Sequence, residues 1–151
     1  MKKLCLIAIC SLALFVVVPV TRAQGGAKHG PEVSRDPGLE KDSQHNLEVA
    51  RHYFKLKKAY VAALQRCEEI IAGNPTYAKI DEVLFIAGES SLRLAESKGK
   101  QTSKDSSDKL RDDARGYLSQ LVNDYPGSSF RKQAEEDLKP LGGPKPKDSK
   151  P

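Results

Sequence analysis

The stretch NLEVARHYFKLKKAYVAALQRCEEIIAGNP, residues 46–75, carries the pattern that decides the fold. Its apolar residues recur every three or four positions, which is the helical period. A short polar break around Lys57 divides the stretch into two helices, the second over about 60–72. Gly73 and Pro75 end that second helix, because glycine suits the position after a helix and proline cannot continue one. The short break requires the two helices to be antiparallel neighbours.

The same period predicts further helices downstream. A long polar segment at 98–107 and the Tyr125-Pro126-Gly127 stop separate them, and they span about 78–97, 107–124 and 128–138. Ser43 is predicted to cap the first helix, and Ser128 or Ser129 to cap the last. No stretch shows convincing strand alternation, so we expect an all-α fold.

The stop signals at Pro75 and Pro126 reveal an internal repeat. The tetratricopeptide unit is a helix-turn-helix of about 34 residues, with small residues where its helices cross and a proline near its end. Aligned on these prolines, the first unit fits except at Arg51 and Ile70, where small residues are usual. The second unit fits in two halves, on either side of the 98–107 insertion. We therefore predict an antiparallel helix-hairpin, right-handed solenoid of about two and a half tetratricopeptide-like units over 43–141.

Two segments, 53–77 and 114–138, resemble a bacterial cell-envelope family. They read YFKLKKAYVAALQRCEEIIAGNPTY and ARGYLSQLVNDYPGSSFRKQAEEDL. They are similar to the BamD-like outer-membrane assembly lipoproteins, which contain tetratricopeptide repeats, and to the repeat domain of the Tol-Pal coordinator. The resemblance implies a scaffold, in the periplasm or at the outer membrane, that serves outer-membrane protein assembly or envelope maintenance. The chain departs from those lipoproteins in lacking a lipid-anchoring cysteine and in having fewer units.

The two ends of the chain are predicted to lie outside the helical domain. Residues 1–23 have a basic start, an apolar run and a Thr21-Arg22-Ala23 ending, which is the layout of a cleaved secretory signal peptide. Residues 24–42 and 142–151 are rich in Gly, Pro and charge, so we expect a disordered leader and a disordered tail. Membrane association is therefore expected to be only indirect.

Composition and charge argue against several classes of function. Of the net charge of +5 in 151 residues, +3 lies in the first 23, which leaves +2 and argues against a nucleic-acid partner. Cys67 is the one cysteine outside the signal segment, and its place on an apolar helix face predicts a buried thiol. No reactive constellation is present, so we predict no enzyme activity and no cofactor. His45 and His52 lie seven residues apart, whereas chelating pairs are usually four apart, so we predict no metal site.

The tetratricopeptide register predicts a protein-binding groove on the first helix of each unit. It is lined by His45, Glu48, His52, Lys55, Glu82, Phe85, Glu89 and Leu92. Exposed Phe85 and Leu92 would contact an extended or helical segment of another cell-envelope protein. In the alternative interpretation these two residues pack against the last helix or a neighbouring chain. A self-associating structural module also stays open, with a homo-oligomer as its form.

Overall fold

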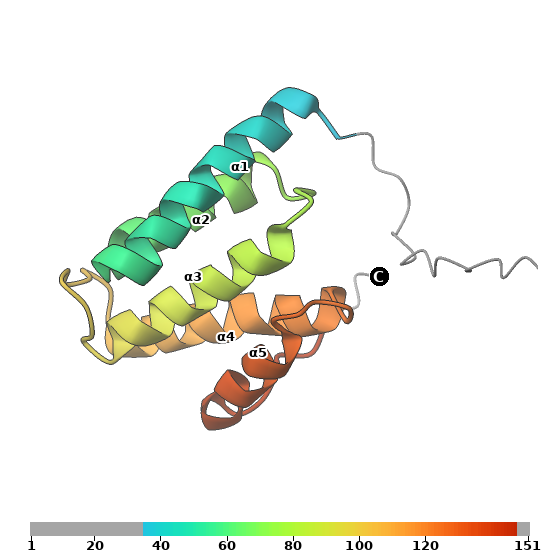
Figure 1. The fold of residues 1–151 in the computed structure, drawn as a ribbon. Helices are drawn as coiled ribbons and strands as arrows, with labels where there is room; N and C mark the ends of the chain where they lie inside the picture. Colours follow the sequence, from blue (N-terminus) through green and yellow to red (C-terminus); the bar gives the residue numbers. More distant parts are fainter. Residues whose placement is uncertain (1–34, 148–151) are drawn as a thin grey trace, which may run out of the picture. The chain divides into compact units, whose positions relative to one another are not determined.

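The computed structural model describes residues 35–147, and within them the chain is all-α. Successive helices pack as antiparallel neighbours (Figure 1), and their bounds are α1 Pro37–His52, α2 Tyr60–Gly73, α3 Ile80–Ala95, α4 Ser107–Asp124 and α5 Arg131–Leu138. The predicted all-α class is confirmed. The predicted signal peptide at 1–23, the leader up to residue 34 and the tail from 148 lie outside the described residues. The described residues, 35–147, all belong to one compact unit.

Helix α1 begins six residues before the predicted cap. The Asp36 carboxylate caps it by accepting from the backbone N–H groups of Gly38 (2.7 Å) and Leu39 (3.1 Å), and Pro37 occupies the first helical position. The prediction of Ser43 as the cap was wrong. Its hydroxyl is buried and accepts a 3.1 Å hydrogen bond from Asn74 Nδ2. Residues 37–42 of the expected leader are therefore helical.

A wide π-helical turn, Tyr53–Lys57, extends α1 and leads into α2. The Ala59 N–H donates to the Tyr53 carbonyl (3.0 Å), and Lys58 takes a left-handed conformation with φ 51°. Left-handed backbone is uncommon outside glycine, so the surrounding contacts must hold this turn. The chain thus reverses within two residues, as the short connection predicts.

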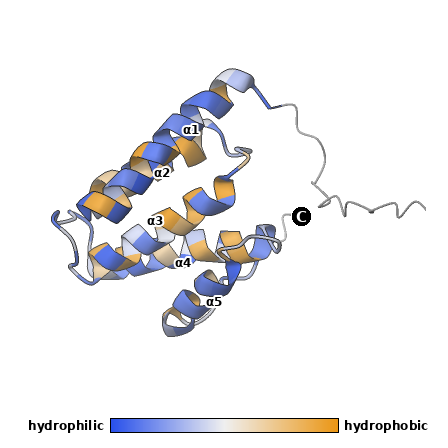
Figure 2. Ribbon diagram, viewed as in Figure 1, coloured by the Kyte–Doolittle hydropathy of each residue, from blue (hydrophilic) through white to orange (hydrophobic). Residues whose placement is uncertain are grey.

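The helices form two layers, with α1, α3 and α5 in one and α2 and α4 in the other (Figure 1). The core lies between these layers, where their apolar faces meet (Figure 2). Helix α3 is buried along most of its length, while α1 and α4 each bury one stripe. The fully buried side chains include Leu84 of α3 and Leu118 of α4. A smaller apolar cluster of Tyr60, Leu94, Ala95 and Leu110 closes the end near the 98–107 segment.

The expected 98–107 insertion is the loop between α3 and α4, and it is fastened to the α1–α2 connection. The Lys100 N–H donates to the Lys58 carbonyl (3.1 Å), and Gln101 Oε1 accepts from the N–H of Ala62 in the first turn of α2 (3.1 Å). The Ser107 hydroxyl donates to the Ala95 carbonyl (2.9 Å), which joins the two ends of the loop. The polar loop therefore closes one end of the helical domain.

The described part of the C-terminal segment, residues 142–147, packs on α4, so the prediction of a disordered tail was wrong there. Gly142 and Gly143 turn the chain with φ of 86° and 78°. The Arg115 guanidinium donates to both of their carbonyls, and the Lys145 N–H donates to the Ser119 hydroxyl (2.8 Å). Side chains of α4 thus satisfy backbone groups that water would otherwise bind.

The last helix also begins later than predicted. Neither Ser128 nor Ser129 caps it, since α5 starts at Arg131 with Phe130 at its N-cap position. The Ser128 hydroxyl instead donates to Asp81 Oδ2 (2.7 Å) and accepts from the Phe130 N–H (3.2 Å). This serine joins the start of α5 to the first turn of α3.

Candidate functional site

Helices α1, α3 and α5 lie in front of α2 and α4 in the view of Figure 1. The predicted groove residues all come from α1 with its π turn and from α3. Contacts join all three front helices: α1 to α3 by the pair Arg51–Glu82, and α3 to α5 by a ring stack. We call this side of the molecule the front face, and it is the candidate site.

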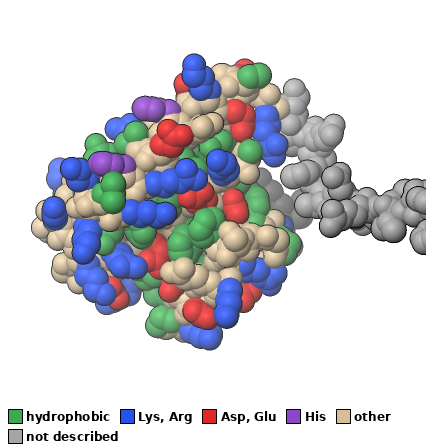
Figure 3. All heavy atoms as spheres, in the orientation of Figure 1, with side chains coloured by type: hydrophobic (Ala, Val, Ile, Leu, Met, Phe, Trp, Pro, Cys, Tyr) green, Lys and Arg blue, Asp and Glu red, His purple; other side chains and the backbone are tan. Residues whose placement is uncertain are grey.

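The α1 half of the predicted groove is open to solvent. Its four residues, His45, Glu48, His52 and Lys55, are all exposed, and we call them the α1 stripe. The only hydrogen bond to their side chains among the described residues is from Gln44 Nε2 to Glu48 Oε1 (3.1 Å). The two histidines stand out along α1 in Figure 3. This stripe is free to contact a partner.

The α3 half of the predicted groove is covered. Phe85 is only 8% exposed and stacks on Phe130, with ring centroids 4.9 Å apart and planes 20° apart. Leu92 is half-buried against the main core. The expectation of two exposed apolar anchors was therefore wrong. For Phe85 the alternative interpretation, packing against the last helix, is confirmed, because Phe130 precedes the first residue of α5.

Glu82 of the predicted groove is part of an ion pair between α1 and α3. Arg51 holds it with two parallel hydrogen bonds, and the Nε–Oε1 distance is 2.6 Å. The hydrogen bond to Glu82 raises the pKa of Arg51 above its ordinary value. Two parallel bonds fix the orientation of both side chains better than a single contact does. Arg51 is one of the two residues that do not fit the predicted repeat alignment.

Glu89, the remaining predicted groove residue, belongs to a second polar group, which we call the polar cluster. It consists of Glu89 and Arg93 of α3, Asp137 of α5, and Phe54 of the π turn. Arg93 Nη2 donates to Glu89 Oε2 (2.6 Å), and its guanidinium lies 5.9 Å from the centroid of the Phe54 ring. Glu89 is only 4% exposed. The cluster joins the π turn, α3 and α5.

Asp137 has an unusual proton affinity in this cluster. Burial, a hydrogen bond with Glu89 and the charge of Glu89 together raise the pKa of Asp137 to about 7, while Arg93 opposes the shift. Glu136 on the same helix adds a small repulsion. Asp137 Oδ2 is buried and accepts no hydrogen bond from a described residue. A proton shared between the two carboxyl groups would remove their repulsion.

This pKa predicts that acid stabilises the domain. The folded state holds a proton between about pH 4 and pH 7 that the unfolded chain releases, so the free energy of unfolding falls as pH rises through that range. We expect a loss of about 1–2 kcal/mol between pH 5 and pH 7.5, since water screens the partly exposed carboxyl. Urea unfolding followed by circular dichroism at several pH values measures it.

Asp137→Asn is expected to remove this pH dependence and to be more stable than the natural protein at pH 7.5. Asp42→Asn, an exposed aspartate of α1, is the matched control and should retain it. An unchanged slope in Asp137→Asn would show that the Glu89–Asp137 contact does not titrate.

Comparison of the chain with protein-family models, curated proteins and solved structures found no match. The resemblance to tetratricopeptide proteins of the cell envelope therefore stays a prediction. The chemistry of the front face has to be judged from its own geometry.

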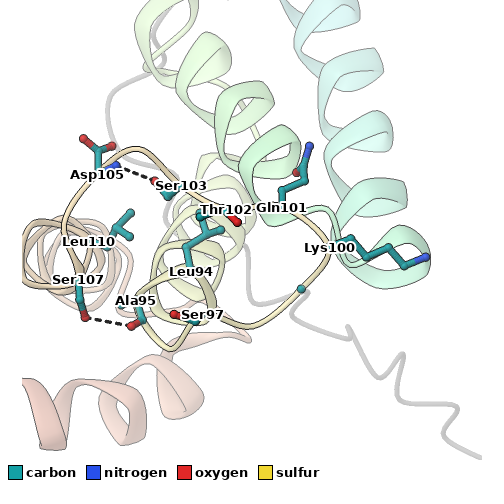
Figure 4. Close-up of a pocket in the computed structure, with 11 residues that line it drawn as sticks. Leu94, Ala95, Ser97, Lys100, Gln101, Thr102, Ser103, Asp105, Ser107 and Leu110 are labelled. Atoms are coloured by element: carbon teal, nitrogen blue, oxygen red, sulfur yellow. Dashed lines mark hydrogen bonds between the residues drawn. The ribbon is translucent and has the colours of Figure 1, made fainter.

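In the described residues, one pocket of about 220 Å³ lies between Leu94, Leu110 and the α3–α4 loop (Figure 4), and one of about 250 Å³ lies between α4 and residues 145–147. Neither adjoins Glu89 or Asp137. The described residues also hold no group of three His, Cys, Asp or Glu side chains placed to bind a metal.

Two further features concern the Cys67 thiol and the hydropathy of the helices. Cys67 is completely buried, so the predicted buried thiol is confirmed, and this burial raises the pKa of the thiol to about 12. Among the helices of residues 35–147, none combines the length and hydropathy that crossing a membrane requires.

Sequence reasoning missed the partners that cover the α3 half of the face. Arg93 lies four residues after Glu89, a spacing that predicts a helical ion pair and could have indicated this contact. Arg51 stood out only as a misfit to the repeat. Asp137 and Phe130 gave no signal, because their contacts with α3 depend on how α5 docks.

Proposed function

We propose that this chain is an exported protein-interaction scaffold of the bacterial cell envelope. Its two helix pairs and α5 would form two and a half tetratricopeptide-like units, and the front face would bind a segment of another envelope protein. The observation that carries the proposal is the α1 stripe, which stays exposed beside a rigid surface of α3 and α5. Periplasmic location and a role in outer-membrane protein assembly or envelope maintenance follow from the sequence resemblance alone.

The packing of the helix pairs supports the repeat interpretation. The tetratricopeptide register places small residues where paired helices cross. Two small residues at such positions are fully buried, Ala63 in the first pair and Ala114 in the second. Gly88 of α3, also at a position where small residues are usual, lies against Leu118 of α4.

The covered apolar residues change the kind of partner that suits the face. With Phe85 and Leu92 occupied inside the domain, recognition has to come from the polar α1 stripe, which carries one acid, one lysine and two histidines. Such a surface fits a polar segment with charges of both signs, and it would give selectivity more than high affinity.

The alternative function is self-association. The polar outer surface of α5, at the C-terminal end of the domain, argues against it. The outer residues of α5, Lys132, Gln133, Glu135 and Glu136, are exposed and polar. Polar outer faces are typical of terminal helices that no further repeat covers. A second copy stacked on α5 would have to desolvate these side chains.

Site-specific photocrosslinking tests the proposal. A photoreactive amino acid replaces His52 in the α1 stripe, and the protein is irradiated in the envelope fraction of the producing bacterium. We expect a discrete crosslinked partner at His52 and none at Gln65, an exposed residue of α2 that serves as the control. Adding Glu48→Lys and Lys55→Glu should reduce the yield about tenfold, since both charges would oppose the partner. Equal yields at His52 and Gln65 would refute the front face as the binding surface.

A further inference from the structure

The α1–α2 connection and the α3–α4 loop meet at one end of the molecule. We call this end the basic tip and define it as Lys55, Leu56, Lys57, Lys58 and Lys100. Lysine and arginine side chains gather at this end in Figure 3, where the connection lies at the left. The Lys100 N–H donates to the Lys58 carbonyl, so the two segments are joined at their backbones.

A glycine makes this close approach possible. Gly99 has φ 97°, and a Cβ there would lie 2.6 Å from the Tyr60 ring and 2.7 Å from the Lys58 carbonyl oxygen. No other residue type fits without moving one of the two segments. The tip is therefore a defined surface, held by packing and hydrogen bonds.

The charge of the basic tip is not neutralised by the domain itself. All four lysines are exposed, and none forms an ion pair with another described residue. The acids of the adjacent loop are already occupied: Glu96 pairs with Lys98 (2.7 Å), and Asp105 pairs with Lys109 (3.2 Å). The tip thus presents four positive charges within a small area.

Leu56 lies in the middle of these charges with its side chain in water. It is 72% exposed, more than any other large apolar residue of the described chain. The π-helical turn, which ends in the left-handed Lys58, holds it at this position. Turns of this kind are frequent at functional sites. An exposed leucine among lysines has the chemistry of a membrane-surface contact.

We propose that the basic tip binds an anionic lipid bilayer surface, with the lysines at the headgroups and Leu56 entering the acyl boundary. Flexible lysines suit a diffuse layer of negative charge, because they make no geometric demand on it. Lys100 also lines the pocket of about 220 Å³ at the α3–α4 loop, whereas Lys55, Lys57 and Lys58 lie outside both pockets described above. Lys55 belongs to both the basic tip and the α1 stripe, so binding to vesicles is measured without any protein partner.

Vesicle binding by residues 24–151 tests it, since the chain without the predicted signal peptide lacks the apolar N-terminal run. We expect sedimentation with phosphatidylglycerol vesicles and none with phosphatidylcholine vesicles, and we expect binding to fall as salt rises. Lys55→Gln with Lys57→Gln should weaken binding about 25-fold, at about fivefold for each lysine. Lys41→Gln with Lys132→Gln removes two exposed lysines elsewhere and should change it little.

Leu56→Ser separates a bilayer from an acidic protein. Burying a leucine side chain contributes roughly tenfold or more to binding, so this variant should lose about that much on vesicles. Polyglutamate, which offers charge without an apolar phase, should bind the variant and the natural protein alike. Failure to bind phosphatidylglycerol vesicles at low salt, or equal losses in the Lys41/Lys132 control, would overturn the proposal. Unchanged vesicle binding by Leu56→Ser would also overturn it, in favour of an acidic partner.

Discussion

Replacement of Leu118 by alanine is expected to lower the free energy of unfolding by about 3–4 kcal/mol. Leu118 is completely buried between α4 and α3, and its side chain contacts the backbone of Gly88. The substitution removes three buried carbons and leaves a cavity that the rigid helix pair cannot fill. Urea unfolding followed by far-ultraviolet circular dichroism measures the loss.

Leu56→Ala is the matched control for this prediction. It makes the same chemical change at a side chain that is 72% exposed, so we expect an effect within about 0.5 kcal/mol. A loss below about 1 kcal/mol for Leu118→Ala would contradict the close packing of α3 on α4.

Gly88→Ala is expected to destabilise the domain by about 2 kcal/mol, although alanine is the better helix former. A Cβ at this position would lie 2.6 Å from Leu118 Cγ and 2.7 Å from its Cδ2. Since Leu118 has no room to move, α3 and α4 would have to separate locally. The same unfolding experiment measures the change.

Gly116→Ala on α4 is the control, because a Cβ there meets nothing within 4 Å. It should stabilise the protein by about 0.5–1 kcal/mol through helix propensity alone. The double variant Gly88→Ala, Leu118→Ala should lose less than the sum of the single variants, because the new methyl group enters the vacated space. Strict additivity would mean that the two residues do not share this contact.

The arrangement of helices was largely predictable because it rests on local signals. Apolar period fixed α2 and α4 to within a residue, and the Gly73–Pro75 and Tyr125–Gly127 stops marked their ends. The start of α1 was missed because Leu39 is the only large apolar residue in 36–42, and one such residue does not show a helical period. Composition likewise suggested a free tail at 142–147, whereas individual side chains of α4 hold this segment.

The candidate site was harder to predict, because exposure depends on tertiary contacts. The repeat register assigned the predicted groove residues to two helices, and in the structure these are α1 with its π turn and α3. It could not indicate that Phe130 covers Phe85, or that Asp137 approaches Glu89. The π turn is also invisible to a helical period, and this turn is what exposes Leu56.

Because Cys67 is buried, chemical labelling of its thiol can report local opening of the helical domain. Once the predicted signal peptide of residues 1–23 is cleaved, Cys67 is the only thiol of the chain. It is completely buried in the main core. Alkylating reagents attack only the deprotonated sulfur, which here forms only when water reaches it. The rate of labelling therefore measures how often the helices separate enough to expose the thiol, without an engineered reporter.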